Sequence, residues 1–287
     1  MKKRLRDRKD GTRIRMNGFD RFLYCLKKKR SEAEVYISRD IDVTNLVSYM
    51  QKKKKENEKM TYFHLFSMAM AKVLYNNHYL NRFIIGGEKY ERNEVSLSFV
   101  AKPEFTDDST ECMAVIKVSE DDNVNSLSEK IRGDVKKIRS NKSNSADGLV
   151  SFLGKLPKFI MNFIVWIICK LDNHDLIPSS LTKESVYHSS VLVSNLGSIH
   201  CDGIYHNLTN FGTCSIVCTI GEITEKPVVI NGKIEKRSIC NFGICLDERI
   251  ADGVYFAKCV NMLEYILKNP ELLEDCANAK VDINKNK

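Results

Sequence analysis

The chain has 287 residues, of which 43% are hydrophobic and 29% are charged, with 14 glycines and five prolines. This composition excludes a collagen-like, low-complexity or wholly disordered chain, and the length suits one large domain or two small ones. The net charge is +8, and residues 1–15 supply +6 of it through eight basic and two acidic side chains. The remainder is nearly neutral, so its charge gives no indication of polyanion binding.

The basic N-terminus is expected to form an arm and lead-in over residues 1–30, followed by the folded domain over residues 31–287. The arm is expected to be a solvated tail or to pack on a neighbouring subunit. Such arms make salt-sensitive, nonspecific contacts with nucleic acids or anionic membranes. This one lacks interleaved aromatic residues and any recognised reader motif, so no specific nucleic-acid partner is predicted.

Ten cysteines are spread along the chain without a CxxC pair, and no histidine stands at zinc-finger spacing from a cysteine pair. A metal site is therefore not predicted. The N-terminus also lacks the apolar stretch and small-residue cleavage site that are typical of a signal peptide. Unlinked thiols without an export signal indicate a cytoplasmic location.

Hydrophobic periodicity predicts an α/β protein built on a mixed sheet, with strands and helices intermixed along the chain. An Asn231-Gly232 turn between apolar segments predicts a β-hairpin. A polar stretch over residues 140–148 separates the two halves without the length of a domain linker. The strands are expected over 34–43, 95–101, 113–118, 190–194, 215–223 and 237–246, and the helices over 62–75, 125–139 and 253–268.

One apolar run, residues 159–169, is interrupted only by Asn162 and flanked by Lys158 and Lys170. As a helix it would be about 16 Å long, roughly half of a bilayer core, so no transmembrane segment is predicted. We expect a buried or subunit-covered helix. Peripheral membrane contact and an acyl-chain pocket are the alternatives.

The segment LDERIADG, residues 246–253, contains the candidate chemistry. By strand alternation, Glu248 falls on the same face as the apolar side chains of the strand that precedes it. If that strand continues, the carboxylate points inward, where an unpaired charge is costly; if the strand ends by Asp247, Glu248 lies in a solvated turn. Asp252 is placed to cap the following helix, and Arg249 is most simply an ion-pair partner.

Five segments of the chain together carry a family resemblance: EVYISRDIDVTNLV (34–47), residues 60–81, VLVSNLGSI (191–199), residues 215–234 and LDERIADG (246–253). In this order they resemble the catalytic domain of the dihydrolipoyl acyltransferases of 2-oxoacid dehydrogenase complexes, whose fold is shared with chloramphenicol acetyltransferase. The resemblance implies a chloramphenicol acetyltransferase-like fold with a mixed β-sheet flanked by helices.

The resemblance also implies a homotrimer whose active sites lie between subunits. In the family, a channel admits coenzyme A from one end and the acyl acceptor from the other, and a signature histidine acts as general base. Carried over by position, Ser194 would stabilise the oxyanion and Asp252 would support the site through an ion pair. Asn195, and His206 on a segment expected to reach the same interface, are the candidate substrate-binding residues; a surface structural role is the alternative for His206.

The base position is occupied by Glu248 instead of histidine. Because carboxylates ordinarily titrate at lower pH than imidazole, Glu248 is either a retuned base or the relic of a lost site. The expected function is therefore acyl transfer between coenzyme A and a small acceptor; the alternative is a catalytically silent trimeric scaffold or ligand-binding relative. Cys245 lies near the signature, but its parity places it on the face opposite Glu248. No lipoyl or subunit-binding domain is expected in this chain.

Overall fold

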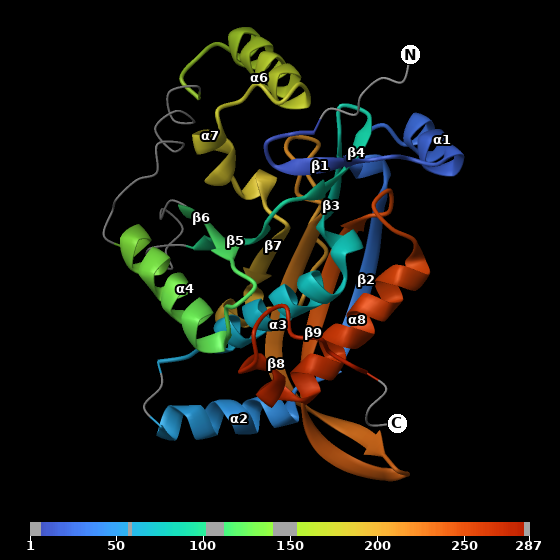
Figure 1. Ribbon diagram of the computed structural model, residues 1–287. Helices are drawn as coiled ribbons and strands as arrows, with labels where there is room; N and C mark the ends of the chain where they lie inside the picture. Colours follow the sequence, from blue (N-terminus) through green and yellow to red (C-terminus); the bar gives the residue numbers. More distant parts are fainter. Residues whose placement is uncertain (1–6, 57–58, 102–111, 140–153, 284–287) are drawn as a thin grey trace.

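A six-stranded mixed sheet forms the centre of the protein (Figure 1). The computed structural model describes residues 7–56, 59–101, 112–139 and 154–283. The strand order is β2-β9-β8-β7-β5-β6, in which β7 pairs in parallel with β5 and β8 while the other neighbours are antiparallel. The strands are β2 (Glu34–Asp42), β5 (Val95–Ala101), β6 (Cys112–Val118), β7 (Val191–Asn195), β8 (Ile216–Ile230) and β9 (Lys233–Asp247). The predicted α/β class with a mixed sheet is confirmed.

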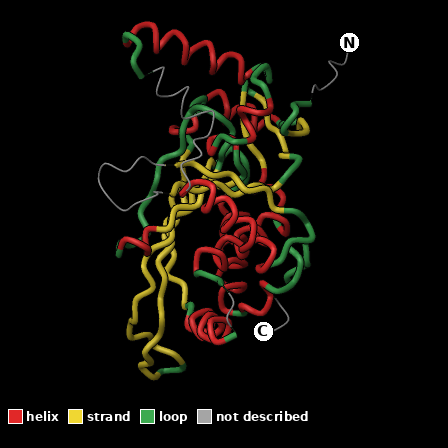
Figure 2. Tube along the Cα trace, turned by 90° about the vertical axis from the view of Figure 1, so that its left-hand side faces the viewer, coloured by secondary structure: helices red, strands yellow, loops and turns green. Residues whose placement is uncertain are grey.

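Four helices cover one face of this sheet and enclose the main hydrophobic core (Figure 2). The central helix is α3, in which every residue from His64 to Leu74 is buried, because its side chains are apolar on almost every face. Its Phe66 ring packs edge-on against Phe242 of β9, with centroids 5.4 Å apart. The four helices are α2 (Thr44–Lys55), α3 (Tyr62–Asn76), α4 (Val124–Arg139) and α8 (Gly253–Lys268).

The hairpin predicted at Asn231-Gly232 joins β8 and β9, which continue past the sheet at the end of the molecule shown lowest in both views (Figures 1 and 2). Asn231 and Gly232 have φ angles of 50° and 78°. Two successive positive φ values belong to the tight turn that this residue pair favours. The predicted polar stretch over residues 140–148 lies outside the described residues.

A second sheet, of order β1-β4-β3, lies at the opposite end of the molecule (Figure 1). Its strands are β1 (Gly11–Ile14), β3 (Arg82–Ile85) and β4 (Glu88–Arg92), and β1 is followed by α1 (Gly18–Leu26). The expectation of a solvated tail is wrong for this part of the arm, since β1 pairs with β4 and Arg8 is buried. Residues 1–6 lie outside the described part of the chain.

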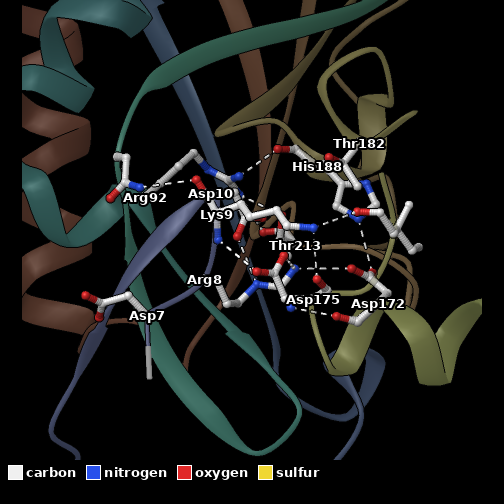
Figure 3. Close-up of polar contacts among 12 residues, drawn as sticks. Asp7, Arg8, Lys9, Asp10, Arg92, Asp172, Asp175, Thr182, His188 and Thr213 are labelled. Carbon is white, nitrogen blue, oxygen red and sulfur yellow. Dashed lines mark hydrogen bonds and ion pairs between the residues drawn. The ribbon is translucent and has the colours of Figure 1, made fainter. Parts of the chain in front are cut away.

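Arg8 is buried, and its charge is compensated by the neighbouring Asp10 and the distant Asp172 (Figure 3). Its Nε donates to Asp10 Oδ1 at 2.9 Å, and its two terminal nitrogens donate to Asp172 O at 2.6 Å and Asp172 Oδ1 at 3.2 Å. His188 Nε2 lies 3.1 Å from the other carboxylate oxygen of Asp172. This Arg8–Asp172–His188 cluster fastens the C-terminal end of α6 (Lys158–Asn173) to the small sheet and to the segment before β7.

The Asp172→Asn variant is expected to lose about 2 kcal/mol of stability at pH 7, because a charged hydrogen-bond acceptor is removed from a buried site. Burial alone raises the pKa of Asp172, but the hydrogen bond and charge of His188 and the charge of Arg8 outweigh it and hold the pKa below its ordinary value. A lowered carboxyl pKa stabilises the fold at neutral pH, and this contribution disappears as pH falls below about 4, through the folded-state pKa.

Urea unfolding of wild type and Asp172→Asn at pH 7 and at acidic pH measures this contribution. The difference in unfolding free energy should shrink in acid, because protonated Asp172 resembles asparagine. A difference that stays the same at both pH values would contradict the assignment.

The predicted apolar run forms most of α6, and the expectation that it is buried is wrong within one chain. Asp172 is the only buried residue of this helix, and it is the one held by Arg8 and His188. Phe159, Phe163 and Trp166 are all exposed. Over the described residues, no helix is both long enough and apolar enough to cross a membrane.

Candidate active site

The chain that leaves β9 brings Glu248 to the end of the central sheet. The strand ends at Asp247, and the Glu248 backbone N–H donates to Ala33 O at 2.9 Å. The Glu248 side chain is 28% exposed and forms an ion pair with Lys27, which follows α1. Of the two alternatives for Glu248, the turn is observed and the inward-pointing carboxylate is not. The Lys27 ammonium donates a charge-assisted hydrogen bond to this carboxylate.

Asp247, directly before Glu248, is the buried carboxylate of this segment. Its two oxygens accept hydrogen bonds from Arg249 Nε at 2.8 Å and Nη2 at 2.7 Å, and Arg30 Nε lies 3.5 Å from Oδ2. The predicted ion-pair role of Arg249 is confirmed. Arg249 also donates to the backbone carbonyls of Lys27 and Lys28, so this buried pair positions the residue that faces Glu248.

Asp252 caps α8, as the spacing predicts. Its Oδ1 accepts a hydrogen bond from the Tyr255 backbone N–H at 2.8 Å, and its own backbone is extended, with φ −86° and ψ 169°. The side chain is exposed. The ion pair observed in this segment joins Asp247 and Arg249. The supporting role that the resemblance assigns to Asp252 stays a prediction.

Ser194 lies on β7, on the face of the sheet that the helices do not cover. Val191 and Val193 enter the main core, whereas Leu192 packs with Val217 and Cys245 on the outer face, where Ser194 also points by alternation. The strand then turns through Asn195, whose carbonyl accepts a hydrogen bond from Ser198 Oγ at 2.8 Å.

Gly197 keeps the turn after Asn195 close to β8. A Cβ atom at this position would lie 2.6 Å from the carbonyl oxygen of Gly221. The glycine of the SNLG segment is therefore required for this close approach of two backbones.

A loop carrying His206 crosses the outer face beside the strand that neighbours Ser194. Ile204 O accepts a hydrogen bond from Thr219 of β8, and Thr219 is the register partner of Ser194. A Cβ on Gly243 of β9 would lie 2.2 Å from Ile204 O, so glycine is needed for the loop to lie this close. His206 itself is exposed, with Nδ1 3.0 Å from Asn207 O. The loop thus shares a sheet face with Ser194, but the role of His206 in substrate binding stays a prediction.

Cys245 is unsuited to act as a nucleophile. It is buried on the outer face, and burial raises the pKa of its thiol to about 12. A reactive cysteine needs an accessible thiolate at neutral pH. In the part of the chain that the structure describes, the cysteines are free thiols.

The strand register keeps Ser194 and Glu248 apart within one chain. Ser194 pairs with Thr219, which in turn pairs with Gly243, five residues before Glu248. Two strand spacings across the sheet and five residues along it separate the two positions by about 19 Å. A single subunit therefore does not bring the predicted base and the predicted oxyanion donor together.

A cavity of about 330 Å³ lies elsewhere, beside the Arg8–Asp172–His188 cluster. Several of its charged side chains are paired with one another: Arg8 with Asp172, and Lys117 with Glu94. The Lys9 backbone N–H donates to the Asp175 carboxylate at 2.9 Å. Ser194 and Glu248 do not line it. This cavity belongs to the junction between α6 and the small sheet.

Sequence reasoning missed Lys27 and the burial of Asp247. Lys27 is 221 residues from Glu248, and no local pattern connects them. Asp247 stands inside the recognised segment. Strand alternation places it on the same face as Cys245, but it does not indicate whether partners bury its carboxylate. Its carboxylate is buried because Arg30 and Arg249 approach it from two different parts of the chain.

The catalytic-domain model of the 2-oxoacid dehydrogenases acyltransferase family matches residues 10–149 and 175–274. The lipoamide acyltransferase component of the branched-chain alpha-keto acid dehydrogenase complex of Bacillus subtilis is 24% identical over 253 residues, which cover 84% of this chain and 49% of that protein. The dihydrolipoyllysine-residue acetyltransferase component of the pyruvate dehydrogenase complex of Staphylococcus epidermidis is 30% identical over 93 residues, 32% of this chain and 21% of that protein. The chain thus spans about half the length, or less, of these curated relatives.

Solved structures share the fold. A probable dihydrolipoamide acetyltransferase from Listeria monocytogenes superimposes with a TM-score of 0.59 at 19% identity, covering 90% of this chain and 95% of that one. A chloramphenicol acetyltransferase gives a TM-score of 0.56 at 10% identity, covering 90% and 100%. The expected chloramphenicol acetyltransferase-like architecture is confirmed. Taken with the matched residues, it shows that this chain belongs to the family of 2-oxoacid dehydrogenase acyltransferase catalytic domains.

Proposed function

We propose that this protein is an acyltransferase that moves an acyl group between coenzyme A and a small acceptor, in a homotrimer whose sites lie between subunits. The observation that supports a site shared between subunits is the separation of about 19 Å between Ser194 and Glu248 within one subunit. Both side chains are half-buried at different places of one subunit, so a neighbouring subunit is needed to complete the pair. Free thiols in the described chain fit a reducing cytoplasm.

In this site Glu248 of one subunit accepts the proton of the acceptor's thiol or hydroxyl. The acceptor's sulfur or oxygen then attacks the carbonyl carbon of the acyl thioester, and the Ser194 hydroxyl of the next subunit donates a hydrogen bond to the oxyanion that forms. When the intermediate collapses, the carbon–sulfur bond to coenzyme A breaks and the leaving thiolate takes the proton from Glu248. Lys27 and the Asp247–Arg249 pair hold Glu248 in position.

A second candidate function is a catalytically silent trimer that binds a ligand or a partner. The ion pair between Lys27 and Glu248 supports it, because the carboxylate is already engaged by an ammonium hydrogen bond within the same subunit. Both candidates share the fold and the assembly, and they differ in what Glu248 does.

Acyl transfer from acetyl-coenzyme A to dihydrolipoamide and to a panel of small thiols, hydroxyls and amines tests the two candidates. Glu248→Ala should lower kcat/KM by a factor of about 100 or more, the usual effect of removing a general base. Glu225→Ala is the matched control, since Glu225 is an exposed glutamate with a lysine partner on the same sheet.

Wild-type activity that survives Glu248→Ala would remove Glu248 from the mechanism. A wild type that binds coenzyme A without turnover, and gains turnover on Glu248→His, would establish the silent relative instead.

A further inference from the structure

The apolar surface of α6 is unusual for a helix on the outside of a domain. Phe159, Phe163 and Trp166 are 74%, 60% and 56% exposed, and Val165 and Leu171 are exposed on other sides of the helix. A helix that is apolar around its circumference is normally found inside a large protein or in a membrane. Here the helix forms one end of the molecule and stands away from the sheets along most of its length (Figures 1 and 2).

The residues that match the family model do not include α6. The family model matches residues up to 149 and again from 175, and α6 (Lys158–Asn173) falls between them. Its last turn is fastened to the body through Asp172 in the Arg8–Asp172–His188 cluster. The exposed aromatic residues therefore project from a helix that is held firmly at one end.

The one acidic residue of α6, Asp172, is buried against Arg8, and the charged residues before it all have one sign. Residues 154–171 contain three lysines, Lys155, Lys158 and Lys170, and no acidic residue. The Lys170 ammonium lies 5.8 Å from the centre of the Trp166 ring, and the Phe163 and Trp166 rings stack with centroids 6.0 Å apart. Aromatic rings beside lysines are the side chains that favour the boundary between lipid headgroups and acyl chains.

We propose that α6 is a membrane-docking helix that lies in the surface of an anionic lipid bilayer. The lysines would face the anionic headgroups while the aromatic and aliphatic side chains enter the acyl boundary. A second copy of α6 complements this surface poorly, because antiparallel packing of two copies would bring Lys158 of one helix toward Lys170 of the other. With 16 residues the helix is too short to span, so it binds from one side.

The chain has one tryptophan, Trp166, so its fluorescence reports on α6 alone. The full-length protein is mixed with vesicles of pure phosphatidylcholine and with vesicles containing phosphatidylglycerol. Binding to the anionic vesicles should shift Trp166 emission to shorter wavelength and carry the protein with the vesicles in flotation. Replacing Lys158 and Lys170 by glutamine should weaken binding about 30-fold, and rising salt should weaken wild-type binding.

Phe159→Ser combined with Phe163→Ser should weaken binding at least about 10-fold, because two large apolar side chains no longer enter the lipid. The matched control is Phe19→Ser with Phe22→Ser, which alters two equally exposed phenylalanines on α1. Circular dichroism verifies that each variant is folded.

Three results would overturn the proposal. The first is the absence of an emission shift and of flotation with anionic vesicles. The second is binding that depends on Phe19 and Phe22 but not on Phe159 and Phe163. The third is a concentration-dependent shift without lipid, accompanied by a rise in mass that the α6 variants abolish, which would show that a second copy covers the helix.

Discussion

Ser194→Ala is expected to lower the rate of acyl transfer by a factor of about 100–1,000, with little change in the stability of the fold. The magnitude is that of removing one donor from an oxyanion site, where the hydrogen bond is needed mainly in the transition state. Ser194 lies on the outer face of β7, away from the helix-covered core, so its truncation leaves the main packing intact. The effect should appear in kcat much more than in KM, measured with acetyl-coenzyme A as donor.

The same variant tests whether the site is shared between subunits. Ser194→Ala and Glu248→Ala are each expected to be nearly inactive, but mixed trimers contain sites that take Ser194 from one variant and Glu248 from the other. Random reassembly of equal amounts after unfolding should restore about a quarter of wild-type activity, because each mixed trimer has one intact site. Two Ser194→Ala preparations mixed in the same way are the control. Failure of the unlike mixture to regain activity would contradict a shared site.

Asp247→Ala is expected to destabilise the protein by about 3–5 kcal/mol, the usual cost of breaking a buried ion pair by removing one partner. The loss leaves the guanidinium groups of Arg249 and Arg30 buried beside a small apolar side chain, and both are at most 5% exposed in the native fold. The midpoint of thermal unfolding should fall by about 10 °C. Circular dichroism in urea and on heating measures both quantities.

Two further variants separate the charge effect from other effects of mutation in this segment. Asp252→Ala removes only the cap of α8 and should cost about 1 kcal/mol. Asp247→Leu combined with Arg249→Met should lose less than Asp247→Ala alone, since Arg30 keeps its backbone acceptor Gly212 O at 3.0 Å. If Asp247→Ala were no more harmful than Asp252→Ala, the buried ion pair would contribute no more to stability than the helix cap does.

Asp247 is connected with the proposed base through its ion-pair partner Arg249. Arg249 donates to the carbonyls of Lys27 and Lys28, and Lys27 pairs with Glu248. The ion pair at the end of β9 thus connects the folded core with the residue proposed as base. The three side chains from Asp247 to Arg249 therefore have separate tasks, although they adjoin in the sequence.

Local patterns in the sequence were sufficient for the secondary structure that contains the candidate site. The all-round apolar pattern over residues 62–75 predicted the buried central helix α3, and Asn231-Gly232 predicted a turn with two positive φ angles. Asp252 was identified as the cap of α8 from its place before an apolar stripe. Each of these features depends on residues close together in the chain, where backbone geometry and side-chain periodicity are decisive.

Contacts between distant parts of the chain could not be predicted in this way. Lys27 reaches Glu248 and Arg8 reaches Asp172 only because the sheets bring together segments more than 160 residues apart. The exposure of α6 was also hidden, since an apolar run has the same pattern whether or not anything covers it. The amino-acid sequence by itself determined most elements of the central sheet and its helices, the family and the candidate residues. Tertiary structure alone decided which charges are buried in pairs, which apolar helix stays uncovered, and how far apart Ser194 and Glu248 lie within one chain. The physical reason is that burial and charge compensation are properties of the assembled fold and not of any local segment.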